Sequence, residues 1–439
     1  MEHNHLAGAE RKGLFVREEN NKSSHPGKWF WVAITLGILL RLYLVLFTEG
    51  TYDAAIWKYH ADGVRELGLM EYYCANQNMN HPPLISIAIS LLPKISEVTH
   101  IPFETLLRMP FALLDGGTLL LLLNLLGNNR HRFALAAFYW LNPLSIIFSS
   151  FHGNTDSAVP FFVMLALWLL SKEKLILAGV AIGAGLWIKL PVILAMPAFF
   201  FFLQGWRKKL LFITAAGLTG ISTYIPALIT NAHVIYKNIF SYHGIITRTS
   251  SGIPIWGCYI FLVPLFDRLP AGFRQIFERP FIYILDNSWS VSLLLIALLS
   301  WLRRSGRTIS RLGATIAASY TIIYGFSNSW TFQYFAWAIP FWVFARPVFF
   351  IPATLFGGSY IYALYWVLCD NPWLRGNWDF IPHPKWPYIV TVFRNLSVIF
   401  FFISACVFLI SPIYEKIRSR LPQRDIKQPP RRQRQPLKS

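Results

Sequence analysis

Apolar runs close to the length of a membrane-crossing helix recur along this chain, and they restrict its fold more than any other feature. The runs begin at Trp29 and continue to a basic C-terminal tail. A helix needs about 20 apolar residues to cross a hydrocarbon core of about 30 Å, and a backbone in lipid must form its own hydrogen bonds. Of the 439 residues, 54% are hydrophobic and only 14% are charged. The sequence therefore predicts an all-α, polytopic bundle of roughly 10–13 membrane spans.

Basic residues outnumber acidic ones, 40 to 21, and they gather in short clusters between the apolar runs. Such clusters mark the cytoplasmic loops of membrane proteins. We therefore expect residues 1–28 to be a cytoplasmic N-terminal tail, residues 29–412 a transmembrane domain, and residues 413–439 a basic cytoplasmic tail. A tail that binds anionic lipid, or one that is simply solvated, accounts for this charge better than a nucleic-acid partner does.

The scarce acidic residues gather directly after the first apolar run, in the loop from Thr48 to Pro83, which contains Glu49 and Asp53. If the N-terminal tail is cytoplasmic, this loop lies outside. Residues 53–70 alternate apolar and polar side chains at helical spacing, which predicts an amphipathic helix lying on the membrane surface. Residues 84–93 are too short to span comfortably and suggest a second interfacial helix.

Further polar segments fall on the same predicted side. One is the turn from His152 to Ser157, and another is Lys189, where the long run 175–203 is expected to turn back. Loop 231–255 and turn 328–335 complete the set. Residues 256–280 fit either a short hairpin or an interfacial segment. A one-sided active site fits this distribution better than a tunnel through the middle of the membrane.

Charged residues inside apolar runs are costly and need an explanation. Arg108 and Asp115 lie seven residues apart, about two helical turns, and so face one side of a helix. They fit either a pairing between helices or a functional role. Arg41, in the first run, is expected to be structural, whereas a cation at the position of Lys189 suits a phosphate group.

Several short motifs, taken in order, resemble the GT-C class of integral-membrane glycosyltransferases. They are the acids of the first loop, the Glu71-Tyr72-Tyr73 stretch with its His81-Pro82-Pro83 exit, the His-Gly-Asn-Thr-Asp-Ser turn at 152–157, Lys189-Leu190-Pro191, and the segment from Tyr334 to Pro340. The arrangement looks most like lipid-linked mannosyltransferases of the GPI-anchor type and their bacterial relatives, and it covers most of 29–412, which would be the catalytic domain. The family's pair of acids in the first loop is closer together than Glu49 and Asp53 are.

The resemblance implies transfer of one sugar, mannose or another hexose, from a polyprenyl-phosphate carrier to a glycan, lipid or protein acceptor on the non-cytoplasmic face. Inversion at the sugar carbon requires a carboxylate base. Asp53 is the first candidate, with its pKa raised by partial burial, Glu49 is the second, and Asp156 would support them. Each aspartate also fits an N-cap, Asp53 for the helix that follows it and Asp156 for the span starting at Ser157.

The substrate-binding candidates follow from the same resemblance, and they include cations for the departing lipid phosphate. They are His152, Asn154, Lys189, His243, Arg248, Gln333 and Tyr334. The chain has no Gly-rich nucleotide cradle, no DxD triplet and no cysteine spacing typical of a metal site. We therefore expect no cofactor, although a divalent cation is not excluded.

A bacterial plasma membrane is the expected location, with the endoplasmic reticulum as the alternative. A second class of function also fits a polytopic chain with charges inside its spans, namely a transporter or a flippase for lipid-linked sugars. A transporter predicts polar residues along the middle of several helices, whereas a transferase predicts them at one face.

Overall fold

The computed structural model describes residues 25–127, 129–241, 255–328, 330–376, 378–379, 381 and 385–418. Within these ranges the regular structure is entirely helical. The first half contains α1 (Lys28–Phe47), α2 (Tyr52–Leu67), α3 (Leu69–Ala75), α4 (Pro83–Ser90), α5 (Leu92–Thr99), α6 (Phe103–Leu126), α7 (Arg132–Trp140), α8 (Pro143–Ser150), the 3-10 helix η1 (Thr155–Ser157), α9 (Ala158–Ser171) and α10 (Leu175–Leu186). The second half contains the 3-10 helix η2 (Leu190–Ala195), α11 (Met196–Phe202), α12 (Trp206–Ser222), α13 (Ile225–Ile235), the π-helix η3 (Tyr236–Phe240), α14 (Tyr259–Asp267), α15 (Ala271–Asp286), α16 (Ser288–Leu302), α17 (Ile309–Phe326), the 3-10 helix η4 (Phe332–Trp337), α18 (Ile339–Trp342), α19 (Pro347–Cys369) and α20 (Tyr388–Arg418).

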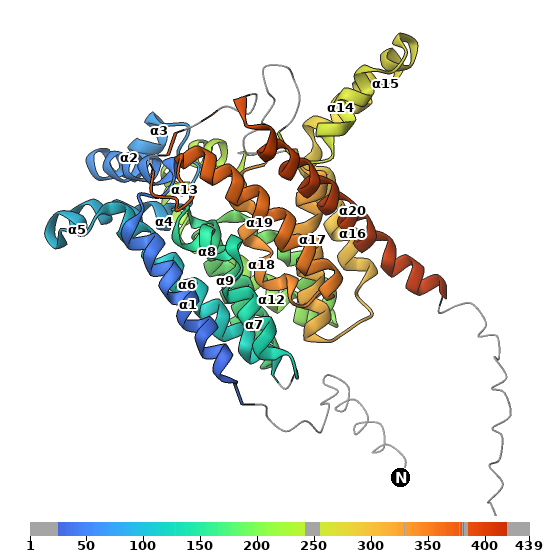
Figure 1. Ribbon diagram of the computed structural model, residues 1–439, viewed down its shortest axis with the longest axis horizontal. Coiled ribbons are helices and arrows are strands. Elements are labelled where there is room, and N and C mark those ends of the chain that lie inside the picture. Colours follow the sequence, from blue (N-terminus) through green and yellow to red (C-terminus); the bar gives the residue numbers. More distant parts are fainter. Residues whose placement is uncertain are drawn as a thin grey trace, which may run out of the picture.

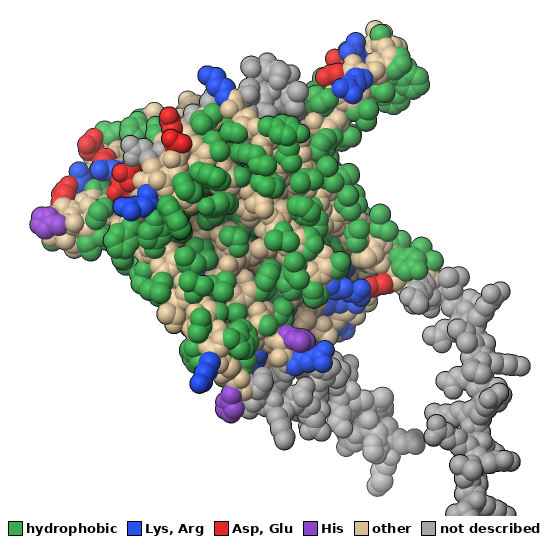
Figure 2. Space-filling model, viewed as in Figure 1, with side chains coloured by type: hydrophobic (Ala, Val, Ile, Leu, Met, Phe, Trp, Pro, Cys, Tyr) green, Lys and Arg blue, Asp and Glu red, His purple; other side chains and the backbone are tan. Residues whose placement is uncertain are grey.

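The helices form a multi-pass bundle, which confirms the predicted all-α polytopic class. Among the described residues, the four helices α1, α6, α19 and α20 are long and apolar enough to cross a membrane, and the number rises to seven if each of three bent pairs is one span. This count is below the expected one because several apolar runs are broken into shorter helices. Apolar side chains cover the sides of the bundle, as a lipid-facing surface requires (Figure 2).

Small residues allow close packing inside the bundle. A Cβ at Gly179 of α10 would lie 2.6 Å from the carbonyl oxygen of Phe212 in α12, and one at Gly183 would lie 2.6 Å from that of Ala216. The two glycines are four residues apart and therefore share one face of α10. This is the small-xxx-small packing by which membrane helices bring their backbones together.

The loop after α1 folds into α2 to α5, which lie together at one end of the bundle (Figure 1). Helix α2 confirms the predicted amphipathic helix. Ala54, Trp57, Ala61 and Val64 are buried, at spacings of three and four residues, while Tyr59 is exposed. Trp57 packs in one hydrophobic cluster with residues of α4 and α6.

Two segments differ from simple spans. At and directly after the predicted turn 328–335 the chain forms the short helices η4 and α18 and not one long span, and α18 is buried inside the bundle. Helix α12 ends at Ser222, and the chain bends by 80° into the segment starting at Ile225. Prolines Pro226 and Pro340 stand in the first turns of α13 and α18, because a ring without an N–H fits a helix start and not its interior.

Candidate active site

Five of the predicted site residues meet at the end of the bundle that carries α2 to α5. We call this group the Asp53 site; it consists of Asp53, His152, Asn154, Asp156 and Lys189. His152 Nε2 lies 3.1 Å from Asp53 Oδ2, and Asn154 Nδ2 donates to the same oxygen at 2.5 Å. Lys189 Nζ lies 3.2 Å from Asp156 Oδ2 and 3.4 Å from Asn154 Oδ1. One connected polar network therefore joins both aspartates.

The turn between α8 and η1 places three of these side chains. Gly153 has a φ of +76°, a left-handed conformation that other residues adopt at a cost, so the chain can reverse here. Asn154 then caps η1 by accepting from the backbone N–H of Thr155 at 2.6 Å. The cap leaves its amide nitrogen free to reach across to Asp53 in α2. The predicted turn therefore positions Asn154 to bind the carboxylate of Asp53.

Asp53 lies in the first turn of α2 but does not cap it. The cap is Thr51, whose hydroxyl accepts from the backbone N–H of Asp53 and donates to the carbonyl of His152 at 2.6 Å. The N-cap interpretation of Asp53 is therefore wrong. Its side chain is 29% exposed, which makes it the more accessible of the two carboxylates.

Burial pushes the pKa of Asp53 upward, but the electrostatic interaction with His152 and the hydrogen bonds from His152 and Asn154 outweigh it, and Lys189 adds to them. The pKa therefore lies below its ordinary value of 3.8. The expectation of a raised pKa is wrong in direction, because partners that only the fold supplies stabilise the ionised form. Asp53 is a carboxylate at neutral pH in this arrangement.

His152 is 3% exposed, and both of its ring nitrogens have protein partners. Nε2 faces Asp53, while Nδ1 is hydrogen-bonded to the hydroxyl of Tyr365 in α19, whose ring stacks on the imidazole with centroids 5.7 Å apart. With a protein partner at each ring nitrogen, the imidazole is held beside Asp53 in this structure. The expected hydrogen bond between His152 and a sugar or phosphate stays a prediction.

Asp156 is almost completely buried at 1% exposure, and its carboxylate faces two donors. Lys189 approaches Oδ2, and the indole N–H of Trp337 donates to Oδ1 at 2.8 Å. The carboxylate caps no helix, since Asn154 caps η1 and no side-chain hydrogen bond caps α9. Lys189 lies where α10 ends and η2 begins, the predicted turn of the 175–203 run, and its side chain is 17% exposed.

The remaining candidates lie at different distances from this group. Tyr334 joins it indirectly, because its ring stacks on that of Trp337 with centroids 4.1 Å apart. Gln333 is half-buried in the same turn, and Glu49 is exposed; neither side chain contacts the Asp53 site through a hydrogen bond or ion pair among the described residues. His243 and Arg248 fall outside the described residues.

Sequence reasoning did not identify Tyr365 as a partner of the site. It lies in the middle of an apolar run where nothing distinguishes it from other aromatic residues of membrane helices. Trp337 was part of the quoted motif, but no role was assigned to it. Only the packing of α19 and η4 against the 152–157 turn reveals their hydrogen bonds.

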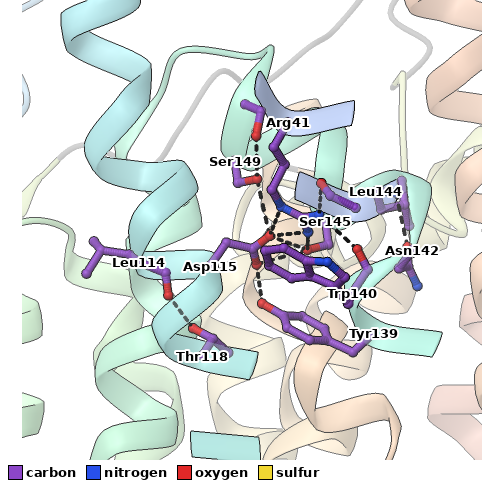
Figure 3. A network of polar contacts seen from close by, with 12 residues as sticks. Arg41, Leu114, Asp115, Thr118, Tyr139, Trp140, Asn142, Leu144, Ser145 and Ser149 are labelled. Carbon is purple, nitrogen blue, oxygen red and sulfur yellow. Dashed lines mark hydrogen bonds and ion pairs between the residues drawn. The ribbon is translucent and has the colours of Figure 1, made fainter. Parts of the chain in front are cut away.

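The charges inside the spans have separate, structural partners (Figure 3). Arg41 forms an ion pair with Asp115, with Nε 2.8 Å from Oδ2, and this carboxylate also accepts from Tyr139 and Ser145. The predicted pairing between helices is therefore present, with Arg41 as the partner. Arg108 is fully buried and donates to the end of α1, including the carbonyl of Thr48 at 2.5 Å.

Fold and site together describe a polytopic membrane protein with an accessible, ionised carboxylate and a lysine at one end of its bundle. No protein-family model matches the chain. A GPI mannosyltransferase 1 from Kluyveromyces lactis is 25% identical over 252 residues, 55% of this chain and 58% of that protein. A GPI mannosyltransferase 1 from Eremothecium gossypii is 24% identical over 275 residues, 60% of this chain and 65% of that protein.

These similarities confirm the resemblance to membrane mannosyltransferases that the motifs predicted. The chain matches less than two thirds of the length of either relative. The similarity to these two GPI mannosyltransferases does not support the expected location in a bacterial plasma membrane.

Proposed function

We propose that this protein transfers mannose from a polyprenyl-phosphate carrier to a glycolipid acceptor of the GPI type. The observation that carries the proposal is the Asp53 site, in which a partly exposed carboxylate and a partly exposed lysine belong to one network at one end of a membrane bundle. The names of the two relatives, both GPI mannosyltransferase 1, support mannose and the GPI acceptor. We also propose the endoplasmic reticulum as the location.

In this mechanism Asp53 is the base. Its carboxylate takes the proton of an acceptor hydroxyl as that oxygen attacks the anomeric carbon, and the bond from that carbon to the carrier phosphate breaks on the opposite side. The configuration at the carbon inverts. Asp53 suits this role because it is ionised and more exposed than Asp156. His152 and Asn154 bind Oδ2 and hold the carboxylate in place.

Lys189 is the proposed partner of the leaving lipid phosphate. A fixed cation stabilises the negative charge that develops as the bond breaks. Asp156, held by Trp337, fixes the position of the lysine before substrate arrives. An ammonium group has three N–H donors, so one remains for a phosphate besides those that face Asp156 and Asn154.

The proposed side of the membrane is the non-cytoplasmic one. Helices α2 to α5 lie at the end of α1 that is opposite to its N-terminal end (Figure 1). If basic tails remain in the cytoplasm, the Asp53 site faces the other compartment. A donor carried by a lipid reaches a site at this level by diffusion within the leaflet.

Purified protein in lipid vesicles, given a synthetic GPI-precursor glycolipid, is expected to transfer labelled mannose from polyprenyl-phosphate mannose. Nucleotide-linked mannose and polyprenyl-phosphate glucose are expected to give no product. Each reaction is run with and without EDTA, and equal rates are expected because the proposed mechanism uses no metal ion. Movement of the labelled donor across the vesicle membrane without any product would favour the transporter alternative and reject the transferase.

Replacing Lys189 with glutamine is expected to lower kcat/KM for the lipid-phosphate donor by about tenfold to a hundredfold. A hydrogen bond to a charged group contributes about 1.5–3 kcal/mol, and each 1.4 kcal/mol is about a factor of ten. Steady-state kinetics at varied donor concentration measure the loss. Lys58→Gln is the matched control, because Lys58 is an exposed lysine of α2. A Lys189 variant that folds and retains the wild-type kcat/KM would contradict the phosphate role.

A further inference from the structure

Helices α14 and α15 form a hairpin that projects from the bundle, at the same end as α2 to α5 (Figure 1). The two helices are joined by the rings of Phe266 and Phe281, which are stacked at 8° with centroids 4.4 Å apart. Beyond this contact and its base at Leu285, most of the hairpin is exposed. Its surface is therefore available to the surroundings of the protein.

Helix α15 has two chemically different faces. At 100° per residue, one face carries Phe273, Ile276, Phe277, Tyr283 and Ile284, and the opposite face carries Arg274, Gln275, Glu278 and Arg279. The apolar face is not packed against protein: Ile276 is 70% exposed and Phe273 is 60% exposed. Figure 2 shows charged side chains on one side of this hairpin and apolar side chains on the other.

The bend at Asn287 sets the direction of this helix relative to the membrane. Helix α16 follows directly and α15 is inclined to it by 72°. Helix α16 has 15 residues, 11 of them apolar and the other four serine, and it spans about 22 Å at 1.5 Å per residue, somewhat less than the roughly 30 Å core. If α16 stands within the usual tilt of about 20° from the membrane normal, α15 runs close to the membrane plane at the edge of the hydrocarbon.

We propose that the α14–α15 hairpin is a membrane-surface anchor, with the apolar face of α15 in the boundary between lipid headgroups and acyl chains. Arg274 and Arg279 then face the headgroup layer and the water, where lipid phosphates lie. Because α15 is steeply inclined to the membrane span α16, its exposed apolar face contacts the lipid that surrounds this span. The proposal is independent of the transfer reaction.

The test places a nitroxide on each face of α15 in the full-length protein, reconstituted in lipid nanodiscs. Cys74 and Cys406 are first replaced by serine, because they are the less buried of the four cysteines. Ile276→Cys reports the apolar face, and Glu278→Cys is the matched control on the opposite face. Electron paramagnetic resonance then compares collisions with oxygen, which concentrates in lipid, and with a water-soluble nickel chelate.

The oxygen-to-nickel collision ratio is expected to be several-fold higher for the label at 276 than for the label at 278. Equal, high access of both labels to nickel would mean that the hairpin stands in water, and would overturn the proposal. Shielding of the 276 label from both reagents would also overturn it, because the apolar face would then be covered by protein. Equal, high access of both labels to oxygen would mean a membrane-inserted segment and not a surface anchor.

Discussion

Replacing Asp53 with asparagine is expected to lower the rate of mannosyl transfer by about 10²–10⁴-fold, the usual contribution of a positioned general base. An amide cannot accept the proton of the acceptor hydroxyl, although it is the same size and can still accept a hydrogen bond from Asn154. Helix α2 is expected to stay folded, because its cap is Thr51. The measurement is single-turnover transfer from the lipid-phosphate donor, with circular dichroism and gel filtration to confirm folding.

Asp62→Asn is the matched control for Asp53→Asn. Asp62 lies on the same helix, its side chain is 37% exposed, and its ion partner is Arg65 at 3.7 Å, so its loss leaves the Asp53 site intact. The control is expected to retain the wild-type rate. Unchanged turnover in a folded Asp53→Asn protein would remove Asp53 from the mechanism.

The lowered pKa of Asp53 predicts how the transfer rate depends on pH, and this pH dependence is a second test of the proposed base. A folded-state pKa below 3.8 means that this carboxylate stays ionised at any pH above that value and is protonated only below it. The wild-type kcat/KM is therefore expected to show no acid limb from Asp53 between about pH 5 and pH 8, where the ordinary carboxylate pKa also lies below the range. The same ionisation stabilises the fold above pH 3.8, and this contribution is lost as the pH falls through the lowered pKa.

Breaking the buried ion pair between Arg41 and Asp115 is expected to have the largest effect on stability. Arg41→Leu or Asp115→Leu leaves one charge without its partner inside the bundle, where such a loss costs about 3–5 kcal/mol. Arg41 would still contact the carbonyl of Trp140 at 2.9 Å, and Asp115 the hydroxyl of Ser145, but neither contact neutralises a charge. Thermal unfolding in detergent, followed by gel filtration, measures the loss.

The double variant Arg41→Leu with Asp115→Leu separates the pair from its surroundings. It is expected to be more stable than either single variant, because no uncompensated charge remains. The coupling free energy from the four proteins measures the interaction. Strictly additive losses would show that each side chain acts through other neighbours, against the assignment of a structural ion pair.

Much of the Asp53 site could be identified from the sequence, because the predicted topology assigns its residues to loops on the same side of the membrane. Asp53, His152 and Lys189 each follow an apolar segment and each was assigned to the outer end, and the structure brings them together. Their individual roles were less predictable. Whether Asp53 caps α2 depends on the hydroxyl of Thr51, two residues earlier, which sequence reasoning overlooked. The partner of Asp115 was equally hidden, since Arg41 lies 74 residues away.

The α12 and η4 segments show a similar division in the fold. The apolar composition of both segments indicates that they avoid water, and hydropathy records no more than that. It does not record whether the segment crosses the membrane or bends within the protein. The 80° bend after α12 and the short turns of η4 and α18 depend on prolines and on neighbours that fill the space around them.

By itself the sequence determined the membrane class, the helical fold, the side on which polar residues gather and the identity of the accessible acid. These follow from solvation, because apolar length, charge position and loop order act along the chain. Only the tertiary structure decided which groups face Asp53, the direction in which its pKa moves and the partners of His152. Hydrogen bonds over a few ångströms between residues about a hundred positions apart, and in the case of Tyr365 more than two hundred, depend on helix packing that no local pattern encodes.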